Sequence, residues 1–302
     1  MKKKYYLVDV FTKKLFGGNP LAVFPQAEDL SEELMQKIAN ELNLSETTFV
    51  FLPQKSKNNC RVRIFTPRSE LPFAGHPTIG TTFVLLQQKI IEPKNETYLV
   101  FEEGIGEINV EFQMQNCFPE LITMSQPLPR FGALFDNVNR LAEMLSLQPD
   151  QLNIDYPAQA VSCGLPTLLV PIRTLTAIKS IKLKLDLWER YLTDFETQQI
   201  MVFTTETEET ESDVHTRFFA PALGIYEDPA TGAASGPLGC YLVKYNLIDS
   251  KENKRIISEQ GYEMRRKSRI YIQIETKNSK IVSVKVSGKC ISVGEGIMRF
   301  HK

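Results

Sequence analysis

Apolar and polar residues follow two different periods along this chain. In several short runs an apolar residue occupies every second position, which predicts β-strands with one buried face. Two other runs, residues 81–86 and 238–243, are apolar on most sides, which predicts helices enclosed by the rest of a domain. The clearest alternating runs are residues 61–65, 107–112, 270–275 and 282–286.

The remaining segments complete a strand-rich pattern with few helices. Ser31, followed by two glutamates, predicts the start of a helix with an apolar face that ends near residue 42. Helices are also expected at residues 138–145 and in the Lys- and Leu-rich stretch that ends at residue 192. Further strands are expected at residues 5–11, 21–24, 46–51, 158–162, 167–172 and 199–204.

One stretch of the chain occurs twice. The first copy is RIFTP at residues 63–67 followed by GHPTIG at residues 75–80, and the second is RFFAP at residues 217–221 followed by DPATG at residues 228–232. Each copy is typical of a strand ending in proline, a turn, and a Pro-x-x-Gly sequence that opens a buried helix. A repeat with a period near half the chain length indicates two related halves.

The repeat and the strand pattern together predict an α+β fold of two pseudo-symmetric domains, each a curled, mostly antiparallel sheet around a central helix. The first domain is expected to span residues 1–126 and to include the last strand, at about residues 290–302. The second is expected to span residues 127–289, beginning where Pro127, Pro129 and Gly132 interrupt the pattern.

The repeated stretch also carries candidate chemistry. Pro77 and Pro229 are predicted to mark the two helix starts, because proline suits the first helical position. A helix start exposes backbone N–H groups and the positive end of the helix dipole, which favour an anion. Two such ends would hold a small carboxylic acid and stabilise negative charge that develops on it. The alternative is that proline and glycine only punctuate the helix starts.

Charge and hydropathy narrow the kinds of partner. The 302 residues include 35 basic and 36 acidic side chains, for a formal charge of -1, and no basic block stands out. Nucleic acid is therefore not expected as a partner. The chain lacks a run of about 18 apolar residues, so no membrane span is expected. Its N-terminal MKKK leads directly into a strand-like segment, which does not resemble a signal peptide.

The cysteines and histidines argue against a metal site or a disulfide framework. The 5 cysteines are odd in number and far apart, without a Cys-x-x-Cys pair, and only 3 histidines are present. Reduced thiols in a cytoplasmic protein are the expectation. Cys163 and Cys240 are interpreted as packing residues, with a cysteine-dependent enzyme as the alternative.

Several motifs resemble the phenazine-biosynthesis PhzF-like family. They are VDVFT at residues 8–12, FGGNP at residues 16–20, LSETTFV at residues 44–50 and the two copies of the repeat. The sequences FAGHP at residues 73–77 and EDPATG at residues 227–232 are the specific pieces. The motifs run in the family's order from residue 8 to about residue 266, so the resemblance covers nearly the whole chain.

The resemblance implies a diaminopimelate epimerase-like fold with the site between its halves, proton-transfer chemistry without a cofactor, and a homodimer. It implies that Glu46 is the acid/base that moves a proton between carbons, while Gly75, His76 and Asp228 line the substrate site. Relatives with this fold that racemise amino acids carry a cysteine at the start of each central helix. Neither helix start here has sulfur, so a single carboxylate shuttle is expected.

The predicted catalytic residues are Glu46, Asp228 and His76. Glu46 heads an apolar strand, where a carboxylate is costly to bury without partners, and a functional base needs that kind of environment. The alternatives are an exposed glutamate at a strand end, a satisfied helix-start histidine at His76, and an N-cap at Asp228. Asp9 and Asn19 are interpreted as supporting or turn residues. The predicted substrate-binding residues are Asn19, Gly75, His76, Pro77, Asp228, Thr231, Gly232 and Ala233.

The predicted function is an isomerase or epimerase that moves a proton within a small carboxylic acid, amino-acid-like or cyclic. Two departures from the family pattern bear on its substrate: Ala233 stands where a serine often follows Ala-Thr-Gly, and RRKS at residues 265–268 replaces Gly-Arg-Pro-Ser. The alternative is a non-catalytic small-molecule-binding or regulatory protein that retains the cleft. The acidic segment 206–213 is predicted to be a solvated loop.

Overall fold

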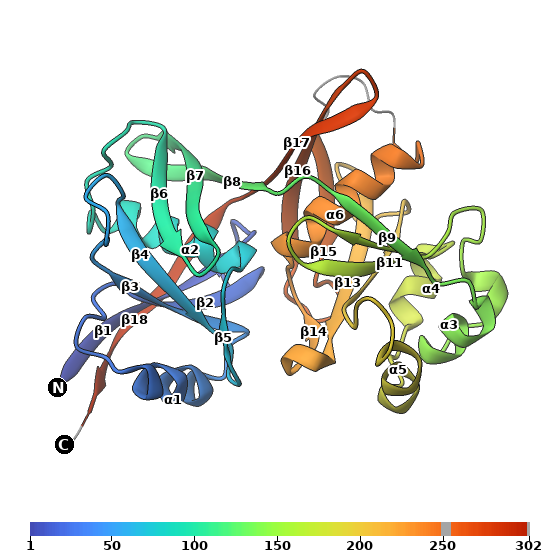
Figure 1. The fold of residues 1–302 in the computed structure, drawn as a ribbon, viewed down its shortest axis with the longest axis horizontal. Helices are drawn as coiled ribbons and strands as arrows, with labels where there is room; N and C mark the ends of the chain where they lie inside the picture. Colours follow the sequence, from blue (N-terminus) through green and yellow to red (C-terminus); the bar gives the residue numbers. More distant parts are fainter. Residues whose placement is uncertain (249–254, 301–302) are drawn as a thin grey trace. The chain divides into compact units, whose positions relative to one another are not determined.

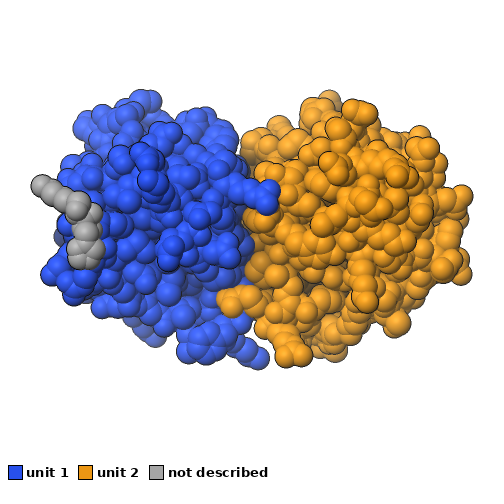
Figure 2. Space-filling model, turned by 90° about the horizontal axis from the view of Figure 1, so that it is seen from below, with its two compact units in different colours: residues 1–125, 287–302 blue, residues 126–286 orange. Residues whose placement is uncertain are grey.

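The computed structural model describes residues 1–248 and 255–300. The chain divides into two compact units, with bounds at residues 1–125 with 287–302, and residues 126–286 (Figures 1 and 2). We call them unit 1 and unit 2. Each consists mainly of strands with one long buried helix, which confirms the predicted α+β class.

Unit 1 contains strands from both ends of the chain. Its helices are α1 (Glu32–Leu42) and α2 (Gly75–Gln87). Its strands are β1 (Lys2–Val10), β2 (Asn19–Phe24), β3 (Glu46–Phe51), β4 (Cys60–Phe65), β5 (Glu70–Leu71), β6 (Tyr98–Glu103), β7 (Gly106–Gln115), β8 (Phe118–Gln126, whose last residue belongs to unit 2) and β18 (Cys290–Arg299).

The strands of unit 1 surround α2. Strand β1 pairs antiparallel with both β18 and β2, and β2 continues parallel to β3. The sheet then runs through β4, β6, β7 and β8 by mostly antiparallel pairing. Every residue of α2 except the last is buried. A Cβ on Gly80 would lie 2.6 Å from Leu21 Cδ2 and 2.7 Å from Val10 Cγ2, so glycine permits the helix to approach the strands closely.

Unit 2 has more helices. They are α3 (Val138–Met144), α4 (Leu175–Ser180), α5 (Leu185–Leu192), α6 (Gly232–Lys244) and the short 3-10 helices η1 (Pro149–Gln151) and η2 (Pro221–Leu223). Its strands are β9 (Arg130–Leu134), β10 (Gln159–Ser162), β11 (Pro166–Pro171), β12 (Ile200–Thr204), β13 (Val214–Ala220), β14 (Ile225–Asp228), β15 (Arg255–Gln260), β16 (Ser268–Lys277) and β17 (Lys280–Gly288), which ends in unit 1.

The two units repeat one series of strand pairings. In unit 1, β2 and β3 are parallel, β3 and β4 antiparallel, and β4 then pairs antiparallel with β5 and parallel with β6. In unit 2, β11, β12, β13, β14 and β15 pair in the same order and directions. The buried helix follows the short strand in both units, so the internal repeat seen in the sequence corresponds to a repeated fold.

Further helices cover apolar strand residues in each unit. Helix α1 begins at the predicted cap, where Ser31 Oγ accepts a hydrogen bond from Leu34 N, and it buries Met35 and Ile38. These residues belong to an apolar cluster that also includes Phe24 and Phe49, whose stacked rings have centroids 5.1 Å apart. In unit 2, residues of α3, α4 and α5 form the corresponding cluster with β11 and β12.

Three helix predictions are corrected by the structure. Helix α2 starts at Gly75, which places Pro77 third in its first turn, where a missing N–H costs nothing. Helix α6 starts at Gly232, so the prediction that Pro229 marks its start is wrong. The stretch that ends at residue 192 forms α4 and α5, two helices separated by residues 181–184.

The predicted hairpin near the C-terminus is present. Strands β16 and β17 are joined at Asn278 and Ser279, which have φ values of 50° and 61°, as a tight hairpin turn requires. Among the residues that the structure describes, no helix has the length and apolarity needed to cross a membrane.

Candidate active site

Three predicted site residues of unit 1 meet at one edge of its sheet. Asn19 and Glu46 are the first residues of β2 and β3, and Leu21 is paired with Glu46 in the parallel ladder. Parallel strands begin at the same edge, which brings both side chains there. His76, the second residue of α2, points to the same place. Asn19 is fully buried, and His76 and Glu46 are 4% and 8% exposed.

His76 links Glu46 to Asn19. Its Nε2 lies 3.2 Å from Glu46 Oε2, and its Nδ1 lies 3.3 Å from Asn19 Nδ2. The contact with Glu46 is close, but it is not aligned as a hydrogen bond. Burial lowers the pKa of His76 to about 3, so the ring is neutral near pH 7. Because the amide nitrogen of Asn19 can only donate, Nδ1 must accept and Nε2 carries the proton that faces the carboxylate.

Asp9 holds the turn that leads to Asn19. Its Oδ2 accepts a 2.7 Å hydrogen bond from Phe16 N, across a loop in which Phe16 has φ 65°. Gly18 has φ 57°, and a Cβ there would lie 2.1 Å from Val10 O. Only glycine fits this position, and the loop thereby sets the start of β2. Asp9 thus has the predicted supporting position, whereas Asn19 contacts His76 directly.

Gly75 and Pro77 flank His76 in the first turn of α2, and both are buried. The residue before the helix, Ala74, has no side chain that could cap it. The first N–H groups of a helix have no partner within the helix itself. An anion at this helix start would therefore meet backbone donors beside Glu46 and His76.

The predicted site residues of unit 2 lie around the start of α6. Asp228 ends β14, and its Oδ2 accepts a 2.5 Å hydrogen bond from Thr231 Oγ1. Thr231, not Asp228, is the N-cap residue of α6, so the N-cap interpretation of Asp228 is wrong. The amide of Gln260, a residue that sequence reasoning missed, bonds to Asp228 O, Thr231 Oγ1 and Thr231 N.

Gly232 and Ala233 occupy the first turn of α6. The Gly232 carbonyl accepts a 3.0 Å hydrogen bond from Gln126 Nε2, and Ala233 is half-buried. Ser235 is fully buried and donates to Thr231 O at 2.8 Å. Its hydroxyl is therefore committed to the helix backbone and does not replace the serine that often occupies position 233 in the family.

A buried carboxyl that the sequence did not reveal lies beside α2. Glu103, at the end of β6, has Oε1 2.7 Å from Thr78 Oγ1, and Thr78 Oγ1 lies 2.7 Å from Ala74 O. Burial raises the pKa of Glu103 to about 8. Thr78 has one hydroxyl hydrogen and the Ala74 carbonyl can only accept, so a protonated Glu103 donates to Thr78.

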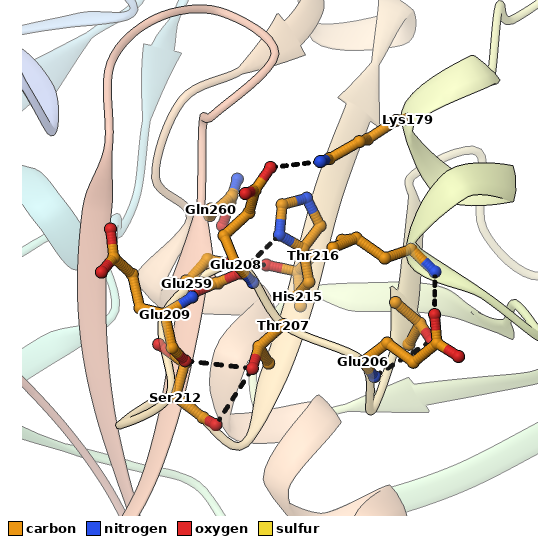
Figure 3. A network of polar contacts seen from close by, with 12 residues as sticks. Lys179, Glu206, Thr207, Glu208, Glu209, Ser212, His215, Thr216, Glu259 and Gln260 are labelled. Atoms are coloured by element: carbon orange, nitrogen blue, oxygen red, sulfur yellow. Dashed lines mark hydrogen bonds and ion pairs between the residues drawn. The ribbon is translucent and has the colours of Figure 1, made fainter.

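A second missed cluster is centred on His215 in unit 2. The ring lies between Glu259 Oε1, 2.7 Å from Nδ1, and Glu263 Oε1, 3.0 Å from Nε2. Figure 3 shows His215 beside Glu259. Glu259 also accepts from the backbone N–H groups of Glu208 and Glu209. The acidic segment is a loop as predicted, but its backbone is tied to this buried carboxylate.

The cysteines take no part in these clusters. All 5 are free thiols. The Sγ atoms of Cys163 and Cys240 lie 3.8 Å apart and both residues are buried. Burial raises the pKa of the thiols of Cys60 and Cys290, which disfavours the reactive thiolate form.

Two repeated units, each a sheet with a buried helix, are what the PhzF-like resemblance of the sequence predicts. A family model described as phenazine biosynthesis-like protein matches residues 8–296. The chain belongs to this family, as the sequence motifs predicted.

Named relatives support the enzyme class. An uncharacterized isomerase of Clostridium acetobutylicum is 34% identical, with 97% of each chain covered. A trans-2,3-dihydro-3-hydroxyanthranilate isomerase of Pseudomonas aeruginosa is 33% identical, covering 97% of this chain and 98% of the relative. The prediction of a PhzF-like isomerase is thereby confirmed.

A solved structure supports the fold. The Bacillus anthracis phenazine biosynthesis protein of the PhzF family matches with a TM-score of 0.91 at 27% identity, over 99% of this chain and 100% of the other. The similarity extends over both units.

Proposed function

We propose that this isomerase moves a proton between carbons of a small carboxylic acid without a cofactor, and that Glu46 carries the proton. The observation that supports this role is the position of Glu46: a buried carboxylate whose Oε2 lies 3.2 Å from a neutral histidine. A neutral imidazole orients the carboxylate without cancelling its charge, so Glu46 keeps the ability to accept a proton.

The proposed reaction requires two proton transfers. Glu46 takes a proton from a carbon next to an activated group, which leaves the electron pair on the substrate. The same carboxyl then returns a proton to a different carbon on the same face of the substrate. Backbone N–H groups at the start of α2, near Gly75 and His76, would stabilise the negative charge in between.

The proposed substrate is a small metabolite with a carboxylate, cyclic or amino-acid-like. The Pseudomonas relative is named for trans-2,3-dihydro-3-hydroxyanthranilate, a cyclic carboxylic acid, and that compound is the first to try. Asp228, Thr231, Gly232 and Ala233 stay predicted substrate-binding residues. A homodimer and a cytoplasmic location also stay predictions.

The decisive experiment is turnover in deuterated water with a panel of small carboxylic acids. A substrate should gain deuterium at the carbon that receives the proton, because the Glu46 carboxyl exchanges with solvent between transfers. Glu46→Gln should abolish this incorporation, a loss of about 100-fold or more. Full incorporation by Glu46→Gln would show that another group is the base.

A matched variant separates catalysis from folding. Glu111, on β7 of the same unit, is exposed, so Glu111→Gln should exchange deuterium like the wild type. All proteins should melt at similar temperatures, since a glutamine side chain has nearly the same volume as the glutamate that it replaces.

Ala233 favours a second candidate function, a non-catalytic binding protein. The resemblance to the family implies that a serine at this position contacts the substrate. The nearby Ser235 cannot take over this contact, because its hydroxyl donates to Thr231 O. Binding of a carboxylic acid by calorimetry, with no deuterium incorporation from any member of the panel, would favour this alternative.

A further inference from the structure

Gln260 makes three hydrogen bonds to the segment that precedes α6. Its Oε1 accepts from Thr231 N at 3.0 Å, and its Nε2 donates to Asp228 O at 2.8 Å and to Thr231 Oγ1 at 3.1 Å. The residue is fully buried. One side chain therefore binds both ends of the turn from residue 228 to residue 231.

The direction of every bond in this group follows from its donors and acceptors. Thr231 N–H can only donate, so Oε1 of Gln260 must face it, and Nε2 must face Asp228 O. The second hydrogen on Nε2 then points to Thr231 Oγ1, which has to accept. The hydroxyl hydrogen of Thr231 is left for Asp228 Oδ2, 2.5 Å away. Asp228 Oδ2 is consequently fixed as an acceptor.

We infer that Gln260 is a positioning residue, which acts through the Thr231 hydroxyl to orient Asp228 and to hold it as a charged carboxylate. Thr231, predicted from the sequence to bind substrate, has its hydroxyl committed to this relay. The consequence for catalysis rests on the proposed function, in which Asp228 lines the site. The relay itself does not depend on that function.

The backbone around Gln260 fixes the amide in place. Strand β15 lies parallel to β13, with Glu259 opposite His215 and Gln260 opposite Thr216. Successive residues of a strand point to opposite faces, so Glu259 reaches His215 (Figure 3), whereas Gln260 reaches the start of α6.

The turn after the strand is equally constrained. Gly261 has φ 78°, and a Cβ there would lie 2.5 Å from both Pro229 O and Arg266 O. Ser268 Oγ donates to Gln260 O at 3.0 Å and lies 3.3 Å from Pro229 O. The RRKS segment thus keeps, at Ser268, a hydroxyl that binds the carbonyl of Gln260.

The test follows the side-chain carboxyl carbon of Asp228 by NMR through a pH titration, with Asp228→Asn to assign the signal. Thr231→Val should raise the titration midpoint by about one to two pH units, because the carboxylate loses a hydrogen bond to its charged form. Thr231→Ser, which keeps the hydroxyl, should titrate like the wild type. A midpoint in Thr231→Val equal to that of the wild type would overturn the relay.

The role of Gln260 is tested by a double-mutant cycle. Gln260→Glu offers Thr231 an acceptor, so the hydroxyl turns away from Asp228 and the midpoint rises. In the Thr231→Val background there is no hydroxyl to turn, so only the added negative charge of the glutamate acts on Asp228. Gln260→Glu should therefore raise the Asp228 midpoint by less in this background than in the wild type. Equal rises in both backgrounds would refute the inference.

Two controls keep the outcome clear. If Gln260→Glu does not fold, Gln260→Met replaces it. The Asp228 titration midpoint of Gln260→Met should lie between those of the wild type and Thr231→Val. A midpoint equal to that of the wild type would refute the inference. Because the titration is read on the protein alone, its result is separate from deuterium exchange by Glu46. In a turnover assay, the acidic limb of the pH profile of kcat/KM should move with the NMR midpoint.

Discussion

The Nε2 atom of His76 lies 3.2 Å from Oε2 of Glu46, while the opposite ring nitrogen faces the amide of Asn19 at 3.3 Å. A charged histidine here would form an ion pair and hold Glu46 in its deprotonated form. Burial instead lowers the pKa of His76 to about 3, so the ring that lies beside the carboxylate is neutral. The pair therefore leaves Glu46 available as a base.

The first prediction is that His76 does not change its charge between pH 5 and pH 9. Its pKa of about 3 places protonation well below this range. NMR spectra of the imidazole carbons, with His76→Phe to assign the signal, should show a constant shift for His76. A titration midpoint near the ordinary value of 6.5 would contradict the neutral ring.

The second prediction concerns the tautomer. Asn19→Asp places a second carboxylate beside the ring, as at His215, so Nδ1 becomes a donor and the ring is held as an imidazolium that pairs with Glu46 and weakens it as a base. We expect kcat/KM to fall by at least about 10-fold, as for a misplaced acid–base group. Asn19→Ser, which can still donate, should retain more activity than Asn19→Asp. Steady-state kinetics would show this order, and the reverse order would contradict the assigned tautomer.

Much of the fold was predictable because its signals are local. Ser31 and the apolar face that includes Met35 and Ile38 predicted α1, and the mostly apolar segments predicted α2 and α6. Glu46 and His76 were assigned through family motifs, since no local pattern shows that positions 46 and 76 are adjacent.

The errors and omissions involve contacts between residues far apart in the chain. Pro77 and Pro229 stand in similar sequences, yet only Pro77 lies within a helix. The turn at residues 228–231, which contains Pro229, is held by Gln260, which is 29 residues from Thr231 along the chain. Glu103 is likewise 25 residues from its partner Thr78. A polar residue in a strand does not reveal its distant partner by periodicity.

The third prediction uses two neighbouring glutamates. Burial raises the pKa of Glu103 from 4.5 to about 8, so the folded protein holds a proton that the unfolded chain loses between these values. Wild-type stability should therefore fall as the pH rises through this window. Glu103→Gln removes the effect, so its free energy of unfolding relative to the wild type should increase by a few kcal/mol between pH 5 and pH 8.

Glu102 provides the matched control. Burial would raise its pKa, but hydrogen bonds from the backbone N–H groups of Lys55 and Gln54 outweigh burial and lower it. The charged Glu102 therefore contributes to the free energy of unfolding at every pH above 4.5. Glu102→Gln should be less stable than the wild type in the pH range where Glu103→Gln becomes more stable than the wild type. Urea unfolding at several pH values measures both. Parallel pH dependence of the two variants would contradict a protonated Glu103.

The last prediction concerns His215, which has no exposed surface and lies between two carboxylates. Burial alone would lower the pKa of His215, but its hydrogen bonds to Glu259 and Glu263 more than offset burial and raise it. Burial would raise the pKa of Glu259, yet the hydrogen bond from His215 and those from the loop backbone lower it. The cluster is thus stable as an imidazolium with two carboxylates.

His215→Gln leaves the fully buried Glu259 carboxylate without its cation, so the free energy of unfolding should fall by about 3–5 kcal/mol at pH 5.5. The histidine's contribution is complete below its unfolded pKa of 6.5 and is lost as the pH rises through the higher folded value. The difference between variant and wild type should therefore shrink toward pH 9.5. Glu211→Gln, which removes an exposed ion pair with Arg269, should change stability by less than about 1 kcal/mol. Urea unfolding at pH 5.5 and pH 9.5 measures these differences in stability. If the loss of stability in His215→Gln is the same at both pH values, the ring contributes by packing rather than by charge.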